Sequence, residues 1–316
     1  MHPGTIKDQV PMNLWYGARK HNSVDSGSKL NAEERGKGMK IAIQGEPGSF
    51  SHEAATRLVP DAKIVPLSLS ADVFSALVHG TVDAAAIPIE NSLAGSVSEH
   101  FDLLLANEVK VERETLLRIR HNLIAVSGTA INDIDRVFSH PVALAQCRRF
   151  LAAHPKMEAF SFYDTAGSVK QLMELRDRHA AAIASEAAAQ YYGANILQAD
   201  IEDNPENYTR FFLVKRSADA SIEAPANKIS LAFSVENRPG SLVAALAEFS
   251  KMGTNLTKIE SRPVHGKPWE YIFYVDCQIQ SREEGQRVIE ALKPHCAMVK
   301  SLGCYQEAEA LTSAAR

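Results

Sequence analysis

The sequence is poor in the features that identify membrane, secreted and nucleic-acid-binding proteins. No apolar run reaches the roughly 18 residues that a membrane-spanning helix needs. The net charge is −4 with both signs mixed, so neither a basic face for nucleic acid nor a polybasic patch for a membrane surface is indicated. The four cysteines have no CxxC spacing, and we interpret them as reduced thiols of a cytoplasmic protein: Cys147, Cys277, Cys296 and Cys304.

The short motifs that mark cofactor and metal sites are also missing. No GxGxxG follows a predicted strand, and there is no GxxxxGK[ST], HExxH or GxSxG. The sequence therefore predicts neither a cofactor nor a bound metal.

The chain is otherwise that of an ordinary globular protein, with 316 residues, 45% of them hydrophobic and 23% charged. This length allows two or three domains of about 100–200 residues each. Residues 1–38 are polar and carry no hydrophobic period. They are expected to be a disordered N-terminal extension, or a stretch upstream of a true start at Met39.

Residues 39–216 alternate between short apolar strands and amphipathic helices, which favours two α/β lobes with largely parallel sheets. Ser51 is the expected N-cap of the first helix. A helix over 70–80 is expected to bury Val73, Leu77 and Val78, and one helix is expected over 141–154. Extended structure over 110–126 would connect the lobes, with a cleft between them.

Residues 217–228 read as a linker, and the pattern changes after it. Ile229, Leu231, Phe233 and Val235 alternate with smaller residues, which predicts a strand with one buried face. Two helices and three more strands follow, giving the βαββαβ order of a ferredoxin-like domain over 228–306 and a tail over 307–316.

Polar side chains gather where the predicted strands end, which is where open α/β sheets bind ligands. Hydroxyls and helix starts there suit an anion, and the shortage of nucleophiles favours positioning and proton donation over covalent catalysis. The candidates are Ser49, Ser51, Glu90, Asn91, Ser92, Ser139, Gln146, Asp164, Thr165, Asn207, Thr209 and Arg210.

Five stretches, in this order, resemble prephenate dehydratases: GEPGSFSHEAA, PIENSLAGSV, SHPVALAQC, DTAGSV and NYTRFFLV. RPGSL and ESRP further on resemble the regulatory ACT domain that usually follows. The resemblance covers about residues 39–306. It implies a periplasmic-binding-protein-like catalytic domain of two lobes (39–216), an ACT domain (228–306), and conversion of prephenate to phenylpyruvate, CO₂ and water in phenylalanine biosynthesis.

The resemblance also implies roles for individual residues. Thr209 would donate to the leaving hydroxyl, and Arg210 would either bind an anion or face a structural carboxylate. Glu90, beside a dianion, would be protonated or would orient a neighbour. The implied catalytic residues are Thr209, Glu90, Asn91, Ser139 and Gln146. The implied substrate-binding residues are Ser49, Ser51, Ser92, Asp164, Thr165, Ala166, Asn207, Arg210 and Phe211.

The ACT-like region is expected to bind phenylalanine and inhibit the enzyme. The implied effector residues are Pro239, Gly240, Ser241, Leu242, Glu260, Ser261, Arg262 and Pro263. ACT domains normally pair their sheets, so the resemblance implies a homodimer or homotetramer.

Two alternatives remain open at this point. The turn Asp164–Ser168 is closer to plant enzymes that prefer arogenate, which carries an amine in place of the keto oxygen. A non-catalytic small-anion binding protein would share the two-lobed architecture. The 38 polar residues cannot form the chorismate mutase domain found in some relatives, so a monofunctional enzyme is expected.

Overall fold

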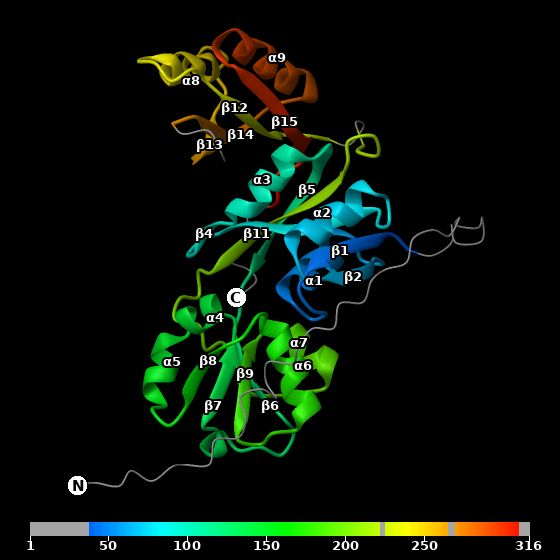
Figure 1. Cartoon of the computed structure of the whole chain (residues 1–316), viewed down its shortest axis with the longest axis vertical. Helices are drawn as coiled ribbons and strands as arrows, with labels where there is room; N and C mark the ends of the chain where they lie inside the picture. Colours follow the sequence, from blue (N-terminus) through cyan, green and yellow to red (C-terminus); the bar gives the residue numbers. More distant parts are fainter. Residues whose placement is uncertain (1–37, 222–224, 265–268, 310–316) are drawn as a thin grey trace. The chain divides into compact units, whose positions relative to one another are not determined.

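The computed structural model describes residues 38–221, 225–264 and 269–309, and Figure 1 shows their helices and strands. The described residues belong to one compact unit and form three sheets. None of the helices in these ranges is long and apolar enough to cross a membrane. The predicted extension over 1–38 lies, except for Gly38, outside the described residues, as does most of the tail over 307–316.

The first lobe is a six-stranded mixed sheet of order β2-β1-β3-β11-β5, with β4 paired to β3. Strand alternation sends Ile41 and Ile43 toward α1 and Ala42 toward α2, so helices cover both faces. The late strand β11 runs antiparallel between β3 and β5 and so returns the chain to this lobe. The elements are β1 (Lys40–Gln44), α1 (Phe50–Leu58), β2 (Lys63–Leu67), α2 (Ser70–Val78), β3 (Ala84–Asn91), β4 (Gly95–Ser96), α3 (Ser98–Ala106), β5 (Val109–Arg118) and β11 (Tyr208–Arg216).

The second lobe is a five-stranded sheet of order β10-β6-β9-β7-β8. Its central strand β9 is an alanine-rich run that is buried along its whole length, as expected of a strand with both faces covered. The elements are β6 (Asn122–Ala125), a 3₁₀ turn (Ile131–Asp133), β7 (Arg136–Ser139), α4 (Pro141–Gln146), α5 (Arg148–Ala153), β8 (Glu158–Ser161), α6 (Thr165–Leu175), β9 (Ala180–Ala184), α7 (Glu186–Tyr192) and β10 (Asn195–Gln198).

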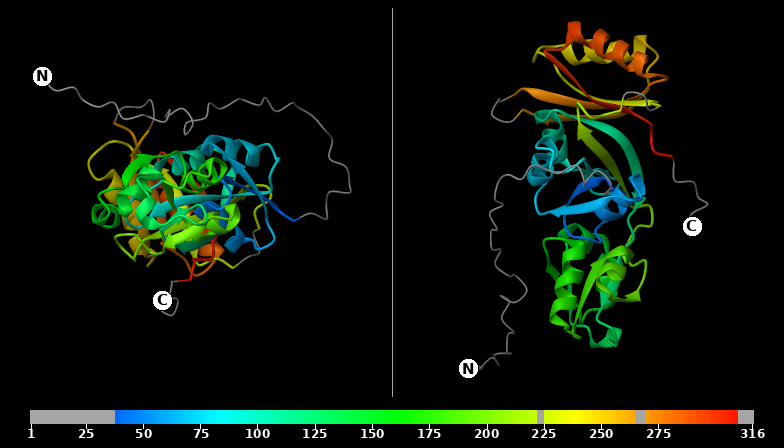
Figure 2. Two further views of the ribbon diagram at one scale, coloured as in Figure 1. Left: turned by 90° about the horizontal axis from the view of Figure 1, so that it is seen from below. Right: turned by 90° about the vertical axis from the view of Figure 1, so that its right-hand side faces the viewer.

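The C-terminal region has the predicted βαββαβ order and a four-stranded antiparallel sheet, β13-β14-β12-β15. Helices α8 and α9 cover one face of this sheet, as the right-hand view in Figure 2 shows. The elements are β12 (Lys228–Ser234), α8 (Ser241–Lys251), β13 (Leu256–Pro263), β14 (Tyr271–Gln278), α9 (Arg282–Leu292), a 3₁₀ turn (Lys293–His295) and β15 (Met298–Tyr305). The predicted fold class, a two-lobed periplasmic-binding-protein-like α/β domain followed by a ferredoxin-like unit, is confirmed.

Three local predictions were wrong. Ser49, not Ser51, caps α1, and its hydroxyl accepts the N–H of His52. Val78 is exposed, and Phe74 takes its place in the core. The single helix expected over 141–154 is two helices meeting at Cys147, because the Asp203 carboxylate accepts the N–H groups that start the second one.

The strand β12 also departs from its predicted pattern, since it is buried on both faces. Its second face packs against the first lobe, where Ala232 and Tyr305 join a hydrophobic cluster with Phe101 and Phe212. An alternating sequence pattern indicates one apolar face, but it does not show whether another part of the chain covers the second face. The predicted domain boundaries stay predictions.

Candidate active site

A cavity of about 520 Å³ is lined by residues of both lobes. The first lobe contributes the loop after β1, the end of β3, the turn around β4, and the start of β11. The second lobe contributes the first turns of α4 and α6. The predicted residues that line the cavity are Ser49, Ser51, Asn91, Gln146, Asp164, Thr165, Thr209 and Phe211.

Asn91 and Thr209 are opposite each other on neighbouring antiparallel strands, and their side chains meet in this cavity. The Asn91 Oδ1 atom accepts the N–H groups of Leu93 and Ala94 at 3.0 and 2.8 Å, which fixes the orientation of the amide. The Asn91 Nδ2 group therefore donates to the Thr209 hydroxyl oxygen at 2.9 Å. Because this oxygen already accepts, the hydroxyl hydrogen of Thr209 can donate to a ligand.

A chain of amides extends from this pair to a buried histidine. Asn91 Nδ2 also donates to Asn207 Oδ1 at 2.7 Å, and Asn207 Nδ2 donates to Gln146 Oε1 at 2.9 Å. Gln146 Oε1 is also 2.9 Å from His121 Nε2, so this nitrogen carries the proton. Burial lowers the pKa of His121, which favours the neutral ring. Its Nδ1 atom has no hydrogen-bond partner among the described residues.

Helices α1 and α6, of 9 and 11 residues, begin at the cavity wall. Ser49 caps α1, and Asp164 caps α6 by accepting the N–H of Gly167 at 2.7 Å. Both caps lie on the wall. The free N–H groups and the dipole of a helix start attract anions, so the cavity can hold carboxylates without cationic side chains. The described lining residues include no lysine or arginine.

The acidic part of the wall is formed by Glu46 and Asp164. Burial and the nearby charge of Glu46 raise the pKa of Asp164 to about 6, although bonds from backbone N–H groups oppose this rise. Glu46 accepts from the Tyr163 hydroxyl at 2.9 Å and from Lys170 at 3.1 Å. These two bonds connect the first lobe to the second.

A further contact between the lobes depends on a glycine. Ser185 donates to the carbonyl oxygen of Gly48 at 2.7 Å. Gly48 has φ +85°, and a Cβ atom there would come within 2.7 Å of the Ala188 Cα. Glycine is required by both the conformation and the approach of α7.

The structure contradicts the site assignments of Glu90 and Arg210. Each follows or precedes a cavity residue in its strand, so alternation turns it to the opposite face of the sheet. Arg210 is 8% exposed and bonds to Glu114, Asp276 and Tyr305. The structural-carboxylate alternative for Arg210 is therefore the correct one, and Glu90 pairs with Lys258 instead of facing the cavity.

Four other predicted residues lie outside the cavity lining. Ser139 is fully buried and donates to the carbonyl oxygen of Ile183, so it holds β7 to β9. Ser92 donates to the Glu206 carbonyl oxygen and accepts the N–H of Tyr208. Ala166 is completely buried. Asn207 is also buried, but it acts on the cavity through Asn91 and Gln146 and lines an adjoining space of about 340 Å³.

The sequence reasoning missed several residues of the wall. Glu46 lies inside the first quoted stretch but was passed over for the serines beside it. His121 follows the long strand β5, where no polar strand-end residue was sought. The lining residues that the sequence did not indicate include Glu46, Phe50, Ser96, His121, His140 and Tyr163. Within the described ranges, no group of three His, Cys, Asp or Glu side chains could hold a metal ion.

The predicted effector residues occupy two places in the C-terminal domain. Gly240, with φ +85°, starts α8, and Glu260 and Arg262 lie on β13. Their side chains turn toward the first lobe, where Glu260 accepts from Ser96 and Arg262 pairs with Asp102. Pro239, Ser241, Leu242, Ser261 and Pro263 complete the predicted set, whose effector role stays a prediction.

The comparisons with known proteins agree with this architecture. The family model described as prephenate dehydratase matches residues 41–219, and the ACT domain model matches residues 229–293. The chain is 37% identical over 292 residues to "Arogenate dehydratase/prephenate dehydratase 2, chloroplastic" of Arabidopsis thaliana, covering 89% of this chain and 76% of the relative.

Two solved structures have the same fold. The prephenate dehydratase of Arthrobacter aurescens, in complex with L-Phe, has a TM-score of 0.76 and 31% identity over 84% of this chain and 89% of its own. GqqA, described as a novel type of quorum quenching acylase, has a TM-score of 0.78 and 30% identity over 85% of this chain and 98% of its own. This chain belongs to the prephenate dehydratase family and carries a C-terminal ACT domain.

Proposed function

We propose that the protein is a prephenate dehydratase that converts prephenate to phenylpyruvate, CO₂ and water in phenylalanine biosynthesis. The family membership supports this activity. The observation that carries the proposal is the Asn91–Thr209 pair, in which the amide donates and the hydroxyl hydrogen is left for a ligand.

The reaction needs one proton at the leaving oxygen. The ring carboxylate leaves as CO₂, its electron pair enters the ring, and the C–O bond on the opposite side breaks. The departing hydroxide takes a proton and becomes water, and the ring becomes aromatic. We assign Thr209 as the donor to the leaving oxygen. A threonine hydroxyl is a weak acid, so proton delivery is concerted with bond breaking or completed through water.

The remaining wall residues would position the substrate. The start of α1, at Ser49, would receive one of its carboxylates, and the start of α6 would receive the other while Asp164 is protonated. Phe211, with 1% exposure, would pack against the ring. Gln146 would add an amide from the second lobe. Holding the ring in one orientation is the main contribution expected of a site with few acids and bases.

A second substrate, L-arogenate, is favoured by the charges on the wall. Arogenate carries an ammonium group where prephenate carries a keto oxygen. Glu46 and Asp164 line the cavity, and Lys170, which is outside the lining, offsets part of this charge by pairing with Glu46 at 3.1 Å. A cationic group suits two nearby carboxylates better than a neutral oxygen does.

The regulatory domain provides the other part of the proposal. The Arthrobacter aurescens relative was solved with L-Phe, and this chain has the same type of C-terminal domain. We propose that L-phenylalanine binds there and inhibits the enzyme. We further propose that the active form is a homodimer or homotetramer in the cytoplasm, with no nucleic-acid or membrane partner.

Product formation from prephenate and from L-arogenate by the same purified protein tests the proposal. Phenylpyruvate from prephenate supports the principal assignment. Phenylalanine from arogenate with a higher kcat/KM would make arogenate the main substrate. No product from either contradicts the proposed function and would direct attention to small-anion binding or to an acylase activity of the kind named for GqqA.

A further inference from the structure

Strands β3 and β11, which carry Asn91 and Thr209, also carry charged side chains on the face turned away from the cavity. Thr209 is in register with Asn91, and Arg210 is in register with Glu90. Adjacent residues of a strand point to opposite faces. Whatever holds Arg210 and Glu90 therefore holds the backbone of the proposed catalytic pair from behind.

The ACT domain supplies two of the partners of Arg210. Its Nη1 atom donates to Asp276 at 2.5 Å, and its Nη2 atom donates to the Tyr305 hydroxyl at 2.8 Å. Two contacts go to the first lobe: Nε donates to Glu114 of β5 at 2.6 Å, and Nη1 lies 3.9 Å from a carboxylate oxygen of Glu90. Arg210 and its three hydrogen-bonding partners are each at most 8% exposed. Water therefore competes little for the bonds between them.

The acids around Arg210 are themselves fixed by the ACT domain. Ser230 donates to the second oxygen of Asp276 at 2.5 Å. Lys228 donates to Glu114 at 3.2 Å. Two carboxylates and two cations thus share one buried cluster that spans both domains.

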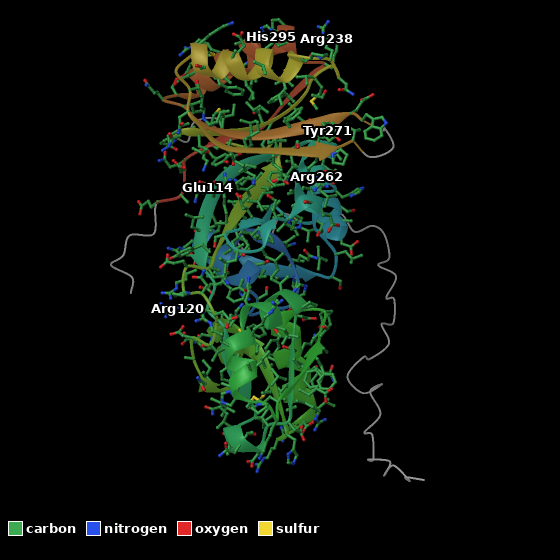
Figure 3. All side chains as sticks on the ribbon, turned by 90° about the vertical axis from the view of Figure 1, so that its left-hand side faces the viewer. Glu114, Arg120, Arg238, Arg262, Tyr271 and His295 are labelled. Carbon is green, nitrogen blue, oxygen red and sulfur yellow. The ribbon has the colours of Figure 1, made fainter. Side chains whose placement is uncertain are left out.

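Glu90 is held by a different ACT strand. Lys258 of β13 donates to Glu90 at 2.9 Å and to the Ser96 hydroxyl at 2.9 Å. Ser96 lies on the cavity wall and in turn donates to Glu260, two residues along the same ACT strand. Figure 3 labels Arg262 of β13 and Glu114 of β5, which belong to opposite sides of this interface.

A buried ionic cluster is weak evidence for stability, because desolvation offsets much of the attraction, but it can fix one geometry. We propose that Arg210 and Lys258 are positioning residues through which the ACT domain sets the placement of Thr209 and Asn91 for the reaction. This inference rests on the proposed function. It makes the ACT domain part of the support of the active site, and gives an effector that shifts β13 or β14 a direct route to the pair.

Two variants and one control test the proposal in the full-length protein. Asp276→Asn removes one charge from the Arg210 cluster without changing volume. Lys258→Met removes the bonds to Glu90 and Ser96, and also the ion pair with Glu260, while keeping the side-chain stem. Lys300→Met is the matched control, because Lys300 crosses the same interface but donates to the carbonyl oxygens of Leu105 and Asn107, beyond the two strands.

We expect kcat to fall about 10–100-fold in both variants, with KM changed less than threefold, since small displacements of positioned groups act mainly on the chemical step. L-Phe should still bind by calorimetry but change kcat less than in the wild type. Lys300→Met should keep the wild-type kcat. Amide hydrogen exchange over 89–97 and 207–212 should rise in the two variants only.

Three results would overturn the inference: wild-type kcat and exchange in both variants, an equal loss in Lys300→Met, or a loss confined to KM. If Asp276→Asn does not fold, Lys258→Met decides, because its partner Glu90 is partly exposed. If the wild type converts neither substrate, the proposed function fails separately. Unchanged exchange in the variants would then also reject the positioning role.

Discussion

Replacing Asn91 by aspartate tests the direction of the Asn91–Thr209 hydrogen bond with almost no change in shape. In the wild type the amide can only donate to the Thr209 oxygen, because its own oxygen is occupied by the N–H groups of Leu93 and Ala94. A carboxylate in its place can only accept. The Thr209 hydroxyl would then turn its hydrogen toward the new oxygen, 2.9 Å away in the present geometry, and away from the substrate.

The size of the effect follows from the strength of that new bond. A hydrogen bond to a charged group contributes about 1.5–3 kcal/mol. Thr209 would have to give up this bond to donate to the leaving oxygen. At 1.36 kcal/mol per decade, kcat for Asn91→Asp should fall about 10–150-fold. The added negative charge should also raise KM for a substrate with two carboxylates.

The assay is steady-state product formation from prephenate between pH 5 and 8. Once the new carboxyl group is protonated it can donate again, so the loss in kcat should shrink toward low pH. Asn195→Asp is the control, since Asn195 is exposed on β10 and the same charge is added there. Wild-type kcat in Asn91→Asp at neutral pH would refute the argument from donor direction.

Four other predictions follow from three sites. Burial raises the pKa of Asp164 from 3.8 to about 6. Its contribution to the free energy of unfolding is therefore full below about pH 4 and is lost as the pH rises through about 6. Asp164→Asn should make the free energy of unfolding, measured by urea titration, decline less over this pH range, and a steeper decline would contradict the prediction. Above pH 6 the ionised Asp164 should also lower kcat/KM for prephenate, and the same variant should remove this limb of the pH profile. Gly48→Ala should destabilise the protein by about 1–3 kcal/mol in urea titrations, because it combines positive φ with a contact on Ala188; an unchanged midpoint would be incompatible with the described turn. Cys147 is fully buried and burial raises its pKa, so it should not react with a thiol reagent before unfolding, and rapid labelling would show that α4 and α5 open in the native state.

Much of the fold could be predicted because the sequence patterns are local. The alternation of apolar strands and helices over 39–216 and the βαββαβ order of the last domain both appear in the structure. The failures occur where a distant segment intervenes. Asp203 splits the helix predicted over 141–154, and the catalytic lobe covers the face of β12 that would otherwise meet solvent.

The candidate site was predicted in part for a similar reason. Polar residues that are far apart in the sequence line one cavity, as Asn91, Gln146 and Thr209 show. Charge was a poor guide, because Arg210 is next to Thr209 in the chain but faces away from it. The alternation of side chains along a strand could have predicted that Arg210 and Thr209 face opposite sides of the sheet. The buried partners of Arg210 could not have been inferred, since they come from β5, β14 and β15.

The central claim is that Thr209 supplies the hydrogen bond that lets the hydroxyl of prephenate leave. Thr209→Val keeps the shape and removes the hydroxyl, and Thr209→Ser keeps the hydroxyl as a control. The most direct measurement is kcat for phenylpyruvate formation by both variants, with folding checked by thermal unfolding. We predict a loss of about 2–4 decades for Thr209→Val and a much smaller loss for Thr209→Ser. A Thr209→Val enzyme with wild-type kcat would contradict the account.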